Sequence, residues 1–266
     1  DIITKGMLRL SSIDSRRWIS FLIDILPEID EISIDMLNTK EKKMLNMLHH
    51  TFRQQPVKRC GFDNVIESIR SIKKNEVLFK EIMELLEIRF NSIDLVDEQI
   101  DLGYECPLDL YCNYTRDQIL SAFDYYTEDI MPPMREGVLY LSDKNTDLLF
   151  VTLNKSEKDY SPTTMYNDYS ISEYLFHWQS QSTTSETSTT GQRYINHKKL
   201  GNKVLLFVRE FREERIGSII MAQPYTFLGL VDYVSHKGSR PMNIIWKLEK
   251  PIPAKYLKKT NKLIVG

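Results

Sequence analysis

The side chains best suited to binding chemistry are concentrated in residues 176–197. An aromatic, strand-like segment leads into residues 180–190, in which nine of eleven residues are Ser or Thr, and Gly191, Gln192, Arg193 and Tyr194 follow. Small hydroxyls, amides, an arginine and aromatic rings at this density favour a surface that contacts phosphate groups and stacks on bases. No nucleophile is paired with a base among them, which disfavours an enzyme active site and leaves no catalytic residue to predict.

Aromatic residues gather just before and within this stretch: seven lie between residues 160 and 194. A protein that inspects one base of a duplex extrudes it, holds it between aromatic rings and hydrogen-bonds its Watson–Crick edge. An Asp can accept from the cytosine amino group, and an apolar wall can sense a methyl group. We therefore predict a base pocket with these candidate residues: Asp147, Tyr160, Tyr166, Asp168, Tyr169, Phe176, Trp178 and Gln179. In a strand Phe176 and Trp178 share one face, so the alternative is that Trp178 belongs to the core beneath the pocket.

The charges are distributed unevenly along the chain. The net charge of −2 combines −4 over residues 1–105, −8 over residues 106–192 and +10 over residues 193–266, where 15 side chains are basic and 5 acidic. Such asymmetry favours a polyanionic partner; a solvated basic face is the alternative. The predicted DNA-binding residues are Gln181, Ser182, Thr183, Thr184, Thr189, Gln192, Arg193, Lys198, Lys199, Lys203, Lys237 and Arg240.

Motifs for other chemistries are missing from the sequence. There is no Gly-x-x-x-x-Gly-Lys-Ser/Thr phosphate loop and no Gly-x-Gly-x-x-Gly, which argues against an ATPase or a dinucleotide enzyme. Cys106 and Cys112 are too far apart for the usual zinc-binding hook, and the histidines form no His-x-x-x-His pair. We therefore predict neither a metal nor a cofactor for this chain.

The first part of the chain is predicted to be helical. Apolar residues recur at helical spacing in residues 15–26, 39–48, 62–73 and 76–90, which predicts a bundle of about five helices. Pro27 ends the first of these segments, and Thr39 is the predicted cap of the second. A bundle of this kind is expected to connect or position other parts of a protein.

The pattern changes near Gly103. A helix capped by Thr115 is predicted first, and strands are predicted at residues 138–141, 147–153, 204–209, 225–229 and 243–248. Short strands with turn-rich connections favour a small barrel or a curved sheet. The sequence therefore predicts an α+β protein with a helical domain at 1–105 and a β-rich domain at 106–266.

Length and composition set the broad class. A chain of 266 residues with 42% hydrophobic and 27% charged residues is typical of a globular protein of one or two domains. It contains no apolar run long enough to cross a membrane, and three cysteines without a paired framework predict reduced thiols in a cytoplasmic protein. Because the sequence begins with Asp1 and not with Met, we expect it to be a fragment of a longer protein.

From about residue 114 to residue 265 the sequence resembles a known family. The runs that carry the resemblance are residues 135–138, 144–155, 160–166, 176–182, 190–194, 225–229 and 235–242. They resemble the carboxy-terminal target-recognition region of SauUSI-type modification-dependent (type IV) restriction enzymes, which are superfamily-two helicases with a phospholipase-D-type nuclease. Residues 1–105 match more weakly the segment that joins the helicase to this region.

The resemblance implies a module that binds DNA containing 5-methylcytosine or 5-hydroxymethylcytosine by base flipping. It implies a curved β-barrel related to SET- and RING-associated (PUA-like) domains, and a helical coupling domain that signals to the motor. Its implied partners are double-stranded DNA and the helicase and nuclease domains of the same polypeptide. ATP and a divalent metal ion would act in the parent protein and not in this part. The alternatives are an interaction module that docks helicase and nuclease domains without base specificity, and a stand-alone nuclease.

Overall fold

The computed structural model describes residues 2–154 and 168–260, and the chain divides into two compact units, Asp1–Pro133 and Met134–Gly266. Residues 106–133, which the sequence assigned to the second domain, thus lie in the first unit. The reason is the packing of one helix: Gln118 donates from Nε2 to Thr51 Oγ1 at 2.9 Å, deep inside the helical unit. The composition changes near residue 103, whereas the packing changes at the Pro132-Pro133 pair.

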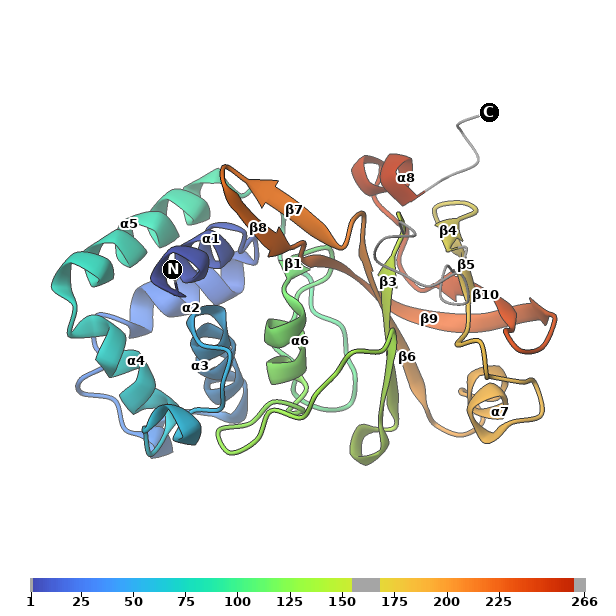
Figure 1. Ribbon diagram of the computed structural model, residues 1–266, viewed down its shortest axis with the longest axis horizontal. Helices are drawn as coiled ribbons and strands as arrows, with labels where there is room; N and C mark the ends of the chain where they lie inside the picture. The colour runs from blue at the N-terminus through green and yellow to red at the C-terminus, as the bar shows by residue number, and fades with distance from the viewer. Residues whose placement is uncertain (1, 155–167, 261–266) are drawn as a thin grey trace. The chain divides into compact units, whose positions relative to one another are not determined.

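The first unit is helical, as predicted (Figure 1). Its helices are α1 (Ile2–Ser11), α2 (Arg16–Ile25), α3 (Thr39–Phe52), α4 (Val65–Lys73), α5 (Glu76–Ser92) and α6 (Arg116–Ala122), with 3-10 turns η1 (Ile34–Met36) and η2 (Lys58–Cys60) and a short strand, β1 (Asn113–Tyr114). Polar caps explain where the helices begin. Asn38, and not the predicted Thr39, caps α3 and forms a capping box with Glu41. Thr115 caps α6 as predicted.

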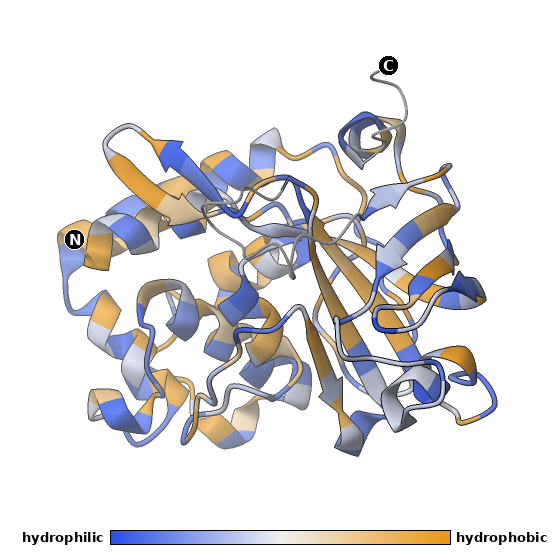
Figure 2. Cartoon of the chain, turned by 45° about the vertical axis from the view of Figure 1, so that its right-hand side comes forward, coloured by the Kyte–Doolittle hydropathy of each residue, from blue (hydrophilic) through white to orange (hydrophobic). Residues whose placement is uncertain are grey.

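The second unit is built on one mixed sheet. Its strand order is β2 (Val138–Leu141), β3 (Thr146–Thr152), β6 (Lys203–Arg209), β9 (Tyr225–Lys237), β10 (Asn243–Leu248), β5 (Leu175–Gln179) and β4 (Tyr169–Ser170). The pairing of β3 with β6 is parallel, and the other pairs along this path are antiparallel. Every residue of β3 is buried, as expected for a strand inside the sheet, and the long strands carry mainly hydrophobic residues (Figure 2).

A 3-10 turn, a β-hairpin and two helices complete the second unit. The 3-10 turn η3 (Ser142–Lys144) joins β2 to β3, and the hairpin of β7 (Glu213–Ile216) and β8 (Ile219–Ala222) forms a separate two-stranded sheet. Helix α7 (Thr189–Ile195) follows the Ser/Thr-rich loop, and α8 (Ala254–Thr260) follows β10. The sequence predicted residues 189 and 190 to belong to the loop, whereas they form the first turn of α7.

The α+β class is confirmed, but the expected closure into a barrel is not found. Among the described residues the sheet is open, with the short strands β2 and β4 at its two edges. The sheet is nevertheless curved, because neighbouring residues of α7 reach strands separated by three others: Arg193 binds Asp147 of β3 and Tyr194 packs on Trp178 of β5. The face of the sheet that carries Asp147 and Trp178 thus packs against α7.

Cys60, Cys106 and Cys112 are all free thiols, and burial raises the pKa of Cys106 to about 12. Within residues 2–154 and 168–260, no helix has the length and apolar character needed to cross a bilayer.

Candidate nucleic-acid interface

Strand β5 divides the predicted pocket residues between two faces of the sheet. Phe176 and Trp178 point into the core under α7, where they are 0% and 3% exposed. Trp178 lies 5.4 Å from Tyr194 in an edge-on arrangement and 6.1 Å from Trp246, measured between ring centroids. Because strand side chains alternate, the residues between them turn to the opposite face. Trp178 therefore belongs to the core beneath the candidate surface.

Two predicted residues from different groups bind each other. The carboxylate of Asp147, on β3, accepts from Nε and Nη2 of Arg193 at 2.8 and 2.9 Å. The same guanidinium lies 3.8 Å above the ring of Tyr140. Burial raises the pKa of Asp147, and Arg193 opposes that rise. Asp147 and Arg193 thus anchor α7 to the sheet, and both oxygens of the predicted base acceptor are engaged.

The opposite face of β5 is polar and partly exposed; we call it the polar face and define it by Tyr169, His177, Gln179 and Asn243. The rings of Tyr169 and His177 stack at 4.7 Å with 12° between their planes. The side-chain amide of Gln179 donates to Asn243 Oδ1 at 3.1 Å, across the β5–β10 pair. Amides and flat rings side by side provide hydrogen bonds and stacking for a base.

Asp168 is buried and binds the backbone of the polar face. It is 2% exposed, and its Oδ1 accepts from the backbone N–H of Gln179 at 2.8 Å. This bond joins the residue before β4 to the last residue of β5, so Asp168 helps to position Tyr169 and Gln179. The predicted pocket residues Tyr160 and Tyr166 lie outside the described residues.

The Ser/Thr-rich loop is held against the β9–β10 turn, and together they form what we call the rim, residues 181–192 and 236–241. The N–H of Ser180 donates to the carbonyl of Met242, and the N–H of Met242 donates to Ser180 Oγ, both at 2.9 Å. The N–H of Arg240 donates to the carbonyl of Thr184 at 3.0 Å. Ser188 caps α7 through the N–H of Gly191. A Cβ atom on Gly191 would lie 2.0 Å from the carbonyl oxygen of Ser185, so only glycine permits this close approach.

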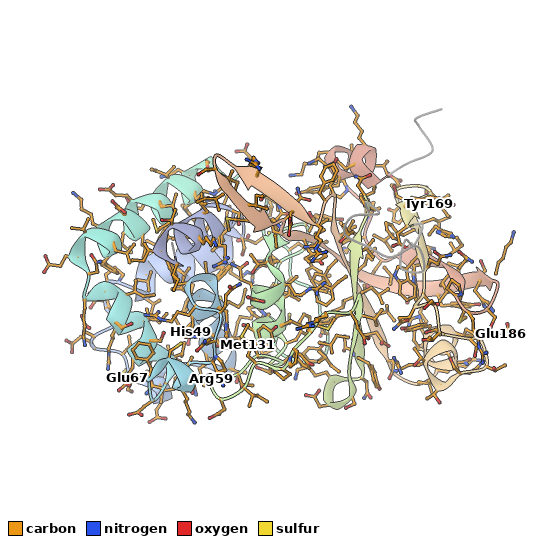
Figure 3. All side chains as sticks on the ribbon, in the orientation of Figure 1. His49, Arg59, Glu67, Met131, Tyr169 and Glu186 are labelled. Atoms are coloured by element: carbon orange, nitrogen blue, oxygen red, sulfur yellow. The ribbon has the colours of Figure 1, made fainter. Side chains whose placement is uncertain are left out.

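The structure brings many of the predicted DNA-binding residues together on the rim. The side chains at its surface are Thr183, Thr189, Gln192, Lys237 and Arg240, all exposed, with Gln181 and Ser182 half-buried. Thr184 is buried, and Gln181 accepts from the hydroxyl of Tyr194 at 3.1 Å, so these two serve the structure of the loop. Tyr169 and Glu186, labelled in Figure 3, mark the polar face and the rim.

The remaining predicted cations lie beyond the rim. Lys198 and Lys199 are exposed after the end of α7, and Lys198 pairs with Asp232 of β9 at 2.7 Å. Lys203 is half-buried at the start of β6. The predicted cations of the last quarter of the chain are thus spread over several elements.

Two residues of the polar face, His177 and Asn243, were missed by the sequence analysis. His177 could have been found from strand alternation, because it lies between two buried aromatic residues. Asn243 becomes visible only through the β5–β10 register, which places it opposite Gln179. Among residues 2–154 and 168–260, no group of three or more His, Cys, Asp or Glu side chains is arranged to hold a metal ion.

Comparison with known proteins adds one match. A family model described as a domain of unknown function (DUF3427) matches residues 108–259. The match begins near the predicted start of the second domain and extends over the helix α6 as well as the sheet. A search of curated proteins found no match to the chain.

Proposed function

Since the chain belongs to the DUF3427 family through residues 108–259, we propose that this family's domain here is a DNA-binding module that recognises modified cytosine. In this proposal the module has no catalytic role of its own. It binds double-stranded DNA containing 5-methylcytosine or 5-hydroxymethylcytosine and flips the modified base. The sequence resemblance to type IV restriction enzymes supports this choice of ligand.

The observation that carries the proposal is the continuity of the polar face with the rim. The side-chain amide of Asn243 meets that of Gln179 on one side and donates to the carbonyl of Lys237 at 3.4 Å on the other. Stacking and amide groups therefore lead without interruption to exposed cations at Lys237 and Arg240. Positive groups beside flat, polar sites favour nucleic acid, whose phosphates and bases need both.

We assign separate roles to the two surfaces. Tyr169 and His177 offer stacking area for the extruded base, and Gln179 and Asn243 offer hydrogen bonds to its edge. The exposed hydroxyls and cations of the rim contact phosphates, and the loop fills the space that the base leaves. Flipping costs a few kcal/mol, and these contacts offset that cost. The curvature of the sheet around α7 supports a relation to the curved PUA-like domains that flip bases.

Coupling to other domains forms the second part of the proposal. The helical unit would transmit DNA binding to helicase and nuclease domains of a longer polypeptide, where ATP and a divalent metal ion would act. The protein would work in the cytoplasm on incoming DNA. An interaction module that docks the same domains without base specificity remains the alternative, and it predicts no binding of DNA by this chain.

The test is a fluorescence-anisotropy titration of the chain with three matched duplexes that differ only in one cytosine: plain, 5-methyl or 5-hydroxymethyl. We expect tighter binding to a modified duplex, loss of binding in a Lys237→Ala/Arg240→Ala variant, and no loss in Lys80→Ala, which removes an exposed cation from α5. Equal affinity for the three duplexes would refute modified-base recognition. Absence of binding to all three would favour the docking module.

A further inference from the structure

A β-bulge in β9 changes the direction of two side chains beside the rim. Ser235 pairs with Ile245, whereas Tyr233 pairs with the next residue, Trp246, so that Val234 has no partner in the register between β9 and β10. In a regular strand residues 233 and 236, three positions apart, would point to opposite faces. The extra residue brings Tyr233 and His236 to the same side, which is the kind of re-aiming for which bulges are used.

The two re-aimed side chains form a chain of hydrogen bonds with the Ser/Thr-rich loop. The hydroxyl of Tyr233 lies 2.6 Å from Nδ1 of His236, and Nε2 of the same ring lies 3.0 Å from Oε2 of Glu186. Tyr233 and His236 come from the sheet and Glu186 comes from the loop. The imidazole therefore bridges the two halves of the rim.

Glu186 is bound through its backbone as well. Its N–H donates to Ser239 Oγ at 3.4 Å, and its carbonyl accepts from the side-chain amide of Gln192 at 2.7 Å. One residue thus joins the loop, α7 and the β9–β10 turn. The imidazole is shielded, with 19% of the side chain exposed, whereas the Glu186 side chain is 53% exposed.

We propose that His236 is a positioning residue that holds the Ser/Thr-rich loop in place on the rim and makes the rim's grip on DNA respond to protons. The part of this proposal that concerns DNA rests on the proposed function. The part that concerns the loop does not, because it follows from the bonds between His236, Tyr233 and Glu186.

Protonation changes the charge of the bridge without breaking it. In the neutral ring, Nε2–H donates to Glu186 and the Tyr233 hydroxyl donates to Nδ1. When the ring takes up a proton from solvent, both nitrogens donate, and the contact with Glu186 becomes an ion pair. The ionisable groups that contact the ring are Glu186 and Tyr233, and β10 opposes His236 with the uncharged Ile244. Histidine is the side chain that proteins most often use as a switch near neutral pH, which makes this bridge a candidate for one.

The loop is tested by hydrogen exchange of the whole chain, followed by mass spectrometry over residues 181–192. Loss of the bridging bonds in His236→Ala should speed exchange of the loop amides by about tenfold relative to wild type at the same pH. Tyr233→Phe, which keeps the ring and its packing, should give a smaller increase. Wild-type exchange rates in both variants would overturn the positioning role, whatever the DNA measurements give.

The proton response is tested by duplex affinity at pH 6.0 and pH 7.5 at constant ionic strength. We expect wild type to bind about two- to fivefold more tightly at the lower pH, the range typical of a partly exposed ion pair. Glu186→Gln should lose most of this ratio. Glu213→Gln is the matched control, because it removes an exposed carboxylate of β7 and should keep the ratio. An unchanged ratio in Glu186→Gln would overturn the proton response. A wild-type protein that binds no duplex at either pH would refute the proposed function instead, and the exchange experiment would still decide the role of His236.

Discussion

The two faces of the β5–β10 pair differ in every property that matters for binding. On the face under α7, the rings of Trp178, Tyr194 and Trp246 lie within 6.2 Å of one another, and none is more than 3% exposed. Tyr194 meets both tryptophans edge-on, and the planes of the two tryptophans are tilted by 49°. On the polar face, Tyr169 and His177 stack in parallel beside an amide pair. Aromatic residues therefore do two different jobs on the two faces of the sheet, and their density in the sequence alone does not separate them.

Burial accounts for the cluster under α7, because large apolar rings that pack against each other are removed from water. The parallel stack is different, since it leaves ring faces and edges near solvent and next to hydrogen-bonding groups. Residues of the first kind should affect folding, and residues of the second kind should affect binding.

The largest effect is expected for Trp178→Ala. Removing a buried tryptophan leaves a cavity between β5, β10 and α7 and should cost about 3–5 kcal/mol in the free energy of unfolding. Urea denaturation followed by circular dichroism measures the loss. A stable Trp178→Ala protein that has lost DNA binding would break the comparison, because it would place Trp178 in the pocket and not in the core.

The ion pair under α7 should come next. Asp147→Ala leaves the guanidinium of Arg193 largely buried without its partner, and we expect a loss of about 3 kcal/mol in the free energy of unfolding. Asp143→Ala, which removes an exposed carboxylate from η3, is the control and should change stability by less than about 0.5 kcal/mol. Equal losses in the two variants in urea denaturation would show that the Asp147–Arg193 contact does not anchor the helix.

Tyr169→Ala should weaken binding and leave the stability of the fold nearly unchanged. We expect a loss of about 1–3 kcal/mol in binding to a modified duplex, as for a stacking residue, with a small change in unfolding. The exposed Tyr174→Ala, five residues away, should leave both quantities near wild type. Anisotropy titrations and urea denaturation of the same samples give the two numbers. Binding unaffected by Tyr169→Ala would remove the polar face from the proposed site.

The stability of the buried cluster should also depend on pH through His197, whose ring lies 5.9 Å from that of Trp246. Its Nε2 accepts from the N–H of Tyr233 at 3.0 Å, and burial lowers the pKa of the ring. The folded state thus disfavours the proton relative to the unfolded chain, whose histidines titrate near pH 6.5. The neutral His197 ring therefore makes its full contribution to the stability of the folded state above that pH. This contribution is lost as the pH falls toward the lowered pKa of the ring.

The corresponding measurement is the melting temperature at pH 7.5 and pH 5.5. The drop on acidification should be smaller in His197→Gln than in wild type. His49 and His50, whose pKa values burial lowers to about 4, remain in both proteins, so the difference isolates His197. An identical drop in both proteins would contradict the expectation.

The smallest effect concerns salt. Each phosphate contact adds about 0.9 to the slope of log affinity against log salt concentration, so Lys237→Ala should lower that slope by about one. Lys80→Ala, on α5, should leave it unchanged. Titrations at several salt concentrations measure the slope, and an unaltered slope for Lys237→Ala would mean that this side chain does not meet a phosphate.

Local signals allowed much of the fold to be predicted. Alternation and apolar runs identified β2 and β10 with their observed bounds, and the Thr115 cap placed α6 correctly. The cap of α3 was placed one residue late because Asn38 and Thr39 are both good caps, and only the reciprocal bond with Glu41 distinguishes them. The strand order and the open edges depend on pairing between distant segments, which no local pattern reveals.

The candidate site was predictable in part for the same reason. The Ser/Thr-rich loop and its cations were recognised from composition, because they lie together in the sequence. The pairing of Asp147 with Arg193 joins residues 46 positions apart, so the sequence did not reveal that the two side chains bind each other. The bulge at Val234 depends on the register of β9 against β10, so the bridge from Tyr233 and His236 to Glu186 was not visible in the sequence.

The position of α6 has a practical consequence for anyone who wishes to produce the family's domain alone. The family match starts at residue 108, but Gln118, Ile119, Leu120, Ser121 and Ala122 are all buried, and Gln118 binds Thr51 of α3. A fragment that starts at residue 108 would contain α6 without its packing partners, and the exposed apolar face of the helix would favour aggregation. A fragment that starts at Met134 omits α6 altogether and begins at the boundary between the two compact units.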